Sequence, residues 1–110
     1  SMIEYDDFAK VDIRVGVITT VDDFQRARKP AYRVTVDFGD ELGAKQSSIQ
    51  ATNYAKDELL GMAVLGVVNL PPRNIAGFLS EVLVLGVPGS DGELALLTPS
   101  RAAAPGGRGY

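Results

Sequence analysis

Residues 69–86 read NLPPRNIAGFLSEVLVLG and connect two apolar, valine-rich runs of the chain. Pro71 and Pro72 fix their own φ angles and cannot donate hydrogen bonds to a sheet ladder, so the strand before them must end. Arg73 and Ser80 then place polar groups on a segment framed by β-branched residues. The segment therefore predicts a long, stiff loop on a β scaffold, which is where binding sites commonly lie.

Alternation of apolar and polar residues on both sides of this loop predicts short strands. Two strands have four residues each that we expect to face the core: Val11, Ile13, Val15 and Val17, then Tyr32, Val34, Val36 and Phe38. Gly16 predicts a bend or bulge in the first of them. The predicted strands cover residues 10–20, 31–38, 45–51, 62–70, 81–87 and 93–97, with a helical turn at 5–9 and a short helix at 57–60. This order predicts an all-β sandwich or barrel.

Length and composition predict one small domain, residues 5–110, without enzymatic chemistry. The chain has 110 residues, a net charge of −3 and a sequence pI near 4.8, and it contains neither cysteine nor histidine. Disulfides and thiolate metal sites are therefore impossible, and the commonest general base and transition-metal ligand are missing. We predict no catalytic residue, no metal and no cofactor.

The N-terminal sequence and the hydropathy of the chain predict its solubility and its location in the cell. No apolar run approaches the ~20 residues of a membrane span, and no signal peptide opens the sequence. We expect a soluble, cytoplasmic protein with no membrane partner. The Ala/Gly/Pro-rich residues 102–109 are expected to be mobile unless a partner orders them.

Four basic residues cluster in and after the loop that follows the first strand: Arg26, Arg28, Lys29 and Arg33. In one interpretation Arg28, Lys29 and Arg33 form an RNA-binding patch that contacts phosphates. In the other, these cations are solvated or pair with Asp22, Asp23 and Asp37. Because the chain as a whole is acidic, any RNA binding must depend on such a local patch.

The predicted third strand and the long loop supply further polar candidates. Lys45, Gln46 and Ser48 can hydrogen-bond RNA or a peptide backbone, although an edge strand can also be polar simply to prevent aggregation. Arg73 offers a bidentate fork to phosphate or a flat face to a base. Two more residues of the loop can bind RNA or brace the loop backbone: Asn69 and Ser80. Glu81 has the same structural alternative.

An apolar group in the loop predicts a second kind of ligand. Ile75, Phe78 and Leu79 can form a groove for an unfolded peptide. Phe78 is the most open of the aromatic candidates, because the alternation places Tyr32 and Phe38 in the core. It can serve a peptide contact, a dimer contact or stacking on a base.

The spaced motifs also resemble a known family. The run FAKVDIRVG at 8–16 is similar to the opening strand of the tRNA-binding-domain family, an oligonucleotide-binding (OB) fold, and residues 69–86 are similar to the loop before its last barrel strand. The runs ARKPAY at 27–32, DFG at 37–39 and KQSS at 45–48 resemble its CsaA-type subgroup of small stand-alone members, described as export-related chaperones. The resemblance covers about residues 5–86.

This resemblance implies both a fold and partners. The fold is a five-stranded OB barrel with a short helix between strands 3 and 4. The implied partners are tRNA or structured RNA, unfolded or exported polypeptides, and a second copy of the chain in a homodimer. The main expectation is a non-catalytic RNA-binding chaperone in protein export. The alternative is a peptide-binding chaperone module with little RNA affinity.

Overall fold

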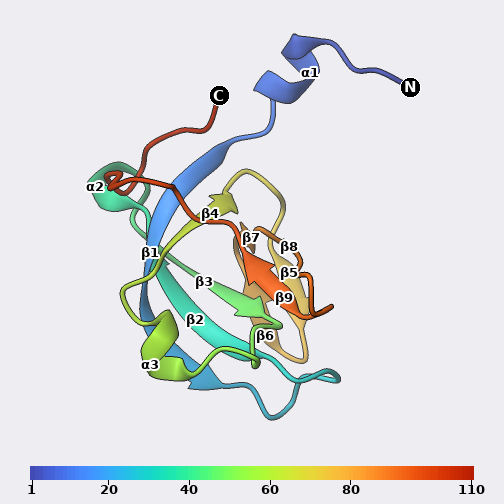
Figure 1. Cartoon of the computed structure of the whole chain (residues 1–110), viewed down its shortest axis with the longest axis vertical. Coiled ribbons are helices and arrows are strands. Elements are labelled where there is room, and N and C mark those ends of the chain that lie inside the picture. The colour runs from blue at the N-terminus through green and yellow to red at the C-terminus, as the bar shows by residue number, and fades with distance from the viewer.

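The backbone forms a nearly closed antiparallel barrel with few and short helices (Figure 1). The structure is a computed structural model that describes residues 1–110. The five barrel strands follow the order β3-β2-β1-β4-β7. Their bounds are β1 Ile13–Asp23, β2 Tyr32–Asp37, β3 Ala44–Ile49, β4 Ala63–Val67 and β7 Leu83–Val84. The helices are α1 Tyr5–Ala9, α2 Gly39–Leu42 and α3 Lys56–Leu59. The expected OB-type barrel, with a short helix between the third and fourth strands, is confirmed.

The barrel closes between β3 and the segment that leads into β7. The Glu81 N–H donates to the Gln46 carbonyl at 2.9 Å, and the Ser47 hydroxyl donates to the Val82 carbonyl at 2.8 Å. Ser47 is only 1% exposed, so its hydroxyl needs this buried acceptor. These bonds fix residues 80–82 beside β3 and thereby set the position of the loop that precedes them.

The barrel core is filled mainly from β2 and its neighbours. Tyr32, Val34, Val36 and Phe38 are all buried, as the alternation predicts. The prediction for β1 was wrong by one residue, because Gly16 and Ile18 face the core instead of Val15 and Val17.

Gly16 explains this error. A Cβ at Gly16 would lie 2.5 Å from Val36 Cγ1 and 2.7 Å from Phe38 Cε1, so only glycine fits beneath these side chains. A core position without a side chain cannot be recognised from apolar alternation. The bulge predicted at Gly16 occurs instead where the β1–β2 register shifts between Ile18 and Thr20.

The C-terminal segment was expected to be mobile, and the structure shows it paired with β1. The Gly106 N–H donates to the Val15 carbonyl at 2.8 Å, and the Gly109 N–H donates to the Ile13 carbonyl at 2.8 Å. This pairing covers the outer side of β1, which is why Val15 is buried although it does not face the core. Hydrogen bonding to Asp12 raises the pKa of the Arg14 guanidinium above its ordinary value, so Arg14 stays charged beside this segment.

Residues 69–86 are more regular than the predicted loop. They contain a hairpin of β5 Arg73–Ile75 and β6 Phe78–Ser80. The predicted strand at 81–87 is divided into β7 and β8 Gly86–Pro88, and β8 pairs with β9 Leu94–Leu96, which corresponds to the predicted strand at 93–97. No helix of the protein has both the length and the apolar character that crossing a bilayer requires.

Candidate functional site

A groove runs between the β1–β2 loop and the β5–β6 hairpin, with β3 at its base. We call it the basic groove, and its volume is about 930 Å³. Its lining comes from three segments: Ala27, Arg28, Lys29 and Ala31; Ser48 and Gln50; Arg73, Asn74, Ile75, Ala76 and Leu83. The structure therefore brings Arg28, Lys29, Ser48, Arg73 and Ile75, which the sequence predicted separately, into one site.

The cations of the basic groove have no acidic partners. The protein contains four ion pairs: Lys10–Asp7, Arg14–Asp12, Lys56–Asp23 and Arg108–Asp12. Arg28, Lys29 and Arg73 take part in none of them, and all three are exposed. The Asp23 carboxylate, one of the alternative partners in the sequence interpretation, binds Lys56 at 3.0 Å instead. The groove thus presents three uncompensated positive charges from two separate segments.

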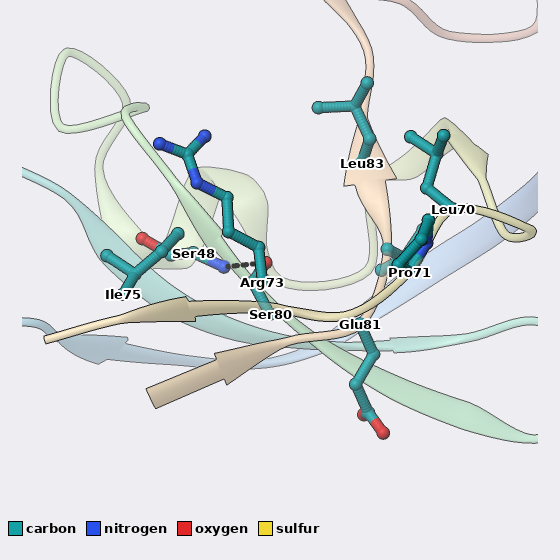
Figure 2. A pocket seen from close by; sticks show the side chains of 9 residues that line it. Ser48, Leu70, Pro71, Arg73, Ile75, Ser80, Glu81 and Leu83 are labelled. Carbon is teal, nitrogen blue, oxygen red and sulfur yellow. Dashed lines mark hydrogen bonds between the residues drawn. The ribbon is translucent and has the colours of Figure 1, made fainter. Parts of the chain in front are cut away.

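A smaller pocket of about 280 Å³ adjoins the basic groove next to the hairpin (Figure 2). We call it the loop pocket. It shares Ser48, Arg73, Ile75 and Leu83 with the groove, and adds Leu70, Pro71, Ser80, Glu81 and Val82. Figure 2 shows Leu70, Pro71 and Leu83 on one side of the Arg73 side chain, with Ser48 and Ile75 on the other. The site therefore combines a cationic rim with an apolar interior.

Several predicted polar side chains form hydrogen bonds with backbone groups of the protein itself. The Ser80 hydroxyl accepts the Ser48 N–H at 3.2 Å, and one Glu81 carboxylate oxygen accepts the Gln46 N–H at 3.0 Å. The Gln46 side-chain amide donates to the Leu79 carbonyl at 2.8 Å. In Figure 2 the Glu81 side chain points away from the pocket. These residues hold the hairpin on β3. For Ser80 and Glu81 this corresponds to the structural alternative that the sequence left open.

Asn69 lies elsewhere and ties two distant segments together. Its side-chain amide donates to the Lys10 carbonyl at 2.7 Å, and its side-chain oxygen accepts the Asp12 N–H at 3.0 Å. Asn69 lines neither the basic groove nor the loop pocket. It braces the entry into β1, not the backbone of its own loop.

Four further predicted residues lie outside the basic groove: Arg33, Lys45, Phe78 and Leu79. The Arg33 guanidinium lies over the Phe24 ring, 5.8 Å from its centroid, and the Phe78 ring packs edge-on against Phe24 at 5.4 Å. Phe78 is half-buried, so it is less open than its loop position suggested. Lys45 is half-buried on β3 and lines neither cavity, and the Leu79 side chain is 46% exposed.

The sequence prediction missed Gln50, Asn74 and Leu83. Gln50 belongs to the predicted polar strand at 45–51, which was the available signal for it, but it was not among the predicted site residues. Leu83 belongs to the apolar run of the predicted strand at 81–87, and it is 51% exposed at the site. An apolar run alone does not show which strand residue points outward.

The comparison with known proteins agrees with this geometry. Residues 13–108 match the family described as a putative tRNA binding domain, which is most of the chain. The chain belongs to this family. In the OB fold, ligands bind on the face of strands 2 and 3 between the loop after strand 1 and the loop before the last barrel strand. The basic groove of this family member occupies that position.

Two solved structures and one enzyme sequence resemble this chain over most of its length. The CsaA chaperone protein from Picrophilus torridus is 53% identical, with a TM-score of 0.94 over 99% of this chain and 100% of that chain. The chaperone CsaA from Bacillus anthracis is 44% identical, with a TM-score of 0.90 over the full length of both. A methionine–tRNA ligase from Bacteroides fragilis is 38% identical over 104 residues, or 94% of this chain. The chain spans only 15% of the length of that ligase.

Proposed function

We propose that the protein binds tRNA or another structured RNA in the basic groove and acts as a CsaA-like chaperone in protein export. One observation carries the RNA-binding part of this proposal. Arg28, Lys29 and Arg73 converge from two segments on a single groove, and none of them forms an ion pair. Unpaired cations on both sides of a groove are suited to a polyanion whose phosphates are spaced along a backbone.

The affinity is expected to depend strongly on salt. Each neutralised phosphate releases condensed counterions, so binding weakens as the salt concentration rises. The net charge of −3 limits long-range attraction and makes contacts in the groove dominant. A titration with unfractionated tRNA at two salt concentrations tests this proposal. Arg101→Ala is the matched control for the loss of one positive charge outside the groove, because Arg101 is exposed and lines neither cavity. Absence of salt-sensitive tRNA binding would contradict the proposal.

Peptide binding is the second candidate, and the loop pocket favours it. Its lining includes Leu70, Pro71, Ile75 and Leu83, of which Leu70 and Leu83 are about half exposed. An apolar interior of this size accommodates one or two apolar side chains of an unfolded polypeptide. Because the pocket shares Arg73 and Ile75 with the basic groove, RNA and peptide should compete.

Two substitutions separate the candidates. Ile75→Ser should weaken binding of an unfolded apolar peptide more than binding of tRNA, because it removes apolar contact area but no charge. Arg73→Ala should weaken binding of tRNA more than binding of the peptide, because it removes a positive charge. An Ile75→Ser variant that suppresses aggregation of an unfolded protein as well as the wild type does would contradict the peptide-binding role of the pocket.

We further propose that the protein acts without catalysis, metal or cofactor. Its hydroxyls at the site have no histidine partner, since the chain contains none. Incubation with a chelator should leave the melting temperature and tRNA affinity unchanged. Turnover of an ester, a nucleotide or RNA that disappears in Ser48→Ala would contradict this part of the proposal.

A further inference from the structure

An aromatic contact joins the two walls of the basic groove, and its two rings are not part of the groove lining. Phe24 stands at the start of the β1–β2 loop and Phe78 on β6. Their ring centroids are 5.4 Å apart with an interplanar angle of 63°, which is the favoured edge-to-face arrangement. We call this pair the aromatic clamp. Neither ring lines the groove.

Each ring of the clamp is attached to the wall that it positions. The Phe24 N–H donates to the Ala31 carbonyl at 3.2 Å, and the Phe24 carbonyl accepts the Ala27 N–H at 3.2 Å. Phe24 is thereby fixed to the loop that carries the groove cations. Phe78 pairs across the hairpin with Ile75, which lines the groove.

Without the clamp, the hairpin has only one attached edge. Strand β6 is bound to β3 through Gln46–Leu79 and Ser48–Ser80, whereas β5, which carries Arg73, pairs only with β6. A two-stranded hairpin held along one edge can rotate about that edge. A contact from Phe78 to the opposite wall removes this freedom.

We propose that Phe24 and Phe78 are positioning residues that set the width of the basic groove. This inference rests on the proposed function and identifies what pre-arranges its site. The cations on the two walls can contact one RNA backbone only at a suitable separation, and a groove already held at that separation loses less conformational freedom on binding. The Arg33 guanidinium over the Phe24 ring strengthens the clamp by a cation–π contact.

The first test compares tRNA binding of the wild type and of Phe78→Ala by fluorescence anisotropy with one labelled tRNA transcript. Loss of an edge-to-face pair should weaken the affinity about three- to tenfold. The salt dependence should keep its slope, because no cation is removed. Phe78→Tyr retains the ring and should restore the affinity. Leu60→Ala is the control, since Leu60 is 49% exposed and lines none of these cavities.

Other outcomes of this test would overturn the inference. Unchanged affinity in Phe78→Ala, or a slope that falls as it does for Arg73→Ala, would mean that Phe78 does not act by positioning. If Phe78→Ala fails to fold, Phe78→Leu keeps most of the volume but not the ring edge, and the same weakening is then expected of it.

The second test needs no RNA, so it separates failure of the clamp from failure of the proposed function. In the free protein, Phe78→Ala should accelerate hydrogen exchange at the amides of Phe24 and Ala27 in the opposite wall as well as in the hairpin. Acceleration confined to the hairpin would show that the two walls are not coupled. If Phe78→Ala accelerates exchange in both walls but the wild-type protein has no affinity for tRNA, the clamp is supported and RNA binding is refuted.

Discussion

Arg73 is the residue on which the two proposed ligands depend most differently. It lies at the end of a Pro71–Pro72 pair, is exposed and makes no ion pair. The prolines stiffen the chain that presents its guanidinium, so little further ordering is needed on binding. Arg73→Ala should lower tRNA affinity and reduce the salt slope by about one unit. The melting temperature should stay within about 2 °C of the wild type, since exposed sites contribute little stability. A large fall in melting temperature with normal affinity would contradict this assignment.

Asn69 should behave in the reverse way. Its amide joins the end of β4 to the entry into β1 through bonds to Lys10 and Asp12. Loss of two such hydrogen bonds in Asn69→Ala should reduce the free energy of unfolding by roughly 1–2 kcal/mol. Chemical denaturation measures this loss, and tRNA titration should show unchanged affinity. Normal stability with weakened binding would return Asn69 to the RNA-binding residues predicted from the sequence.

At the scale of elements, the β5–β6 hairpin turns through an unfavourable residue. Ala76 has a φ of 51° and Gly77 a φ of 86°, so both central residues of this two-residue turn are left-handed. Such a type I′ turn favours Asn-Gly, whereas alanine is strained there. Ala76→Asn should therefore raise the free energy of unfolding by about 0.5–1 kcal/mol. Gly77→Ala should lower it through backbone strain alone, because a Cβ at Gly77 has only the Arg26 guanidinium within 4 Å. Denaturant midpoints that move in the same direction for both variants would contradict this reading of the turn.

The same hairpin shows what the sequence could and could not predict. Its polar and apolar residues marked the segment as a binding loop, and Pro71 and Pro72 located the end of the preceding strand. The Ala76-Gly77 turn was missed because alanine is a weak signal for a left-handed conformation. The roles of Gln46 and Glu81 could not be predicted either, since their partners lie in segments that meet only when the barrel closes.

The C-terminal segment shows, at the scale of the whole molecule, that tertiary contacts cannot be predicted from local sequence. Residues 102–109 have the composition of a mobile tail, yet their backbone pairs with β1. Composition reports the intrinsic preference of a segment, whereas a neighbouring strand with free hydrogen-bonding groups can override it. For the same reason, four cations in the β1–β2 loop and on the strand after it could not be assigned to a common surface. The fold shows Arg28 and Lys29 in the groove and Arg33 outside it.

We expect the whole molecule to form a homodimer through its N-terminal arm. Helix α1 and the residues before it extend away from the barrel (Figure 1), and Met2, Ile3 and Tyr5 are mostly exposed. Residues 94–97 are apolar as well, but they are half-buried within this chain, so α1 is the better candidate. Apolar groups on an arm are covered when two copies pair. Light scattering should give twice the monomer mass at micromolar concentration, and Ile3→Glu with Tyr5→Glu should reduce it to the monomer mass. A monomeric wild type would contradict this expectation.

The last prediction concerns the charge of the whole molecule, which is negative while its proposed ligand is a polyanion. If binding depended on the overall field, removal of any three cations would have the same effect. If it depends on the basic groove, replacement of Arg28, Lys29 and Arg73 by alanine should nearly abolish tRNA binding. The salt slope should then fall by roughly 2–3 units, since each phosphate contact contributes about 0.7–0.9. A control variant with Lys10, Lys56 and Arg101 replaced has the same net charge but an intact groove, and should keep the slope. Equal losses in both triple variants would show that the overall charge, and not the groove, governs binding.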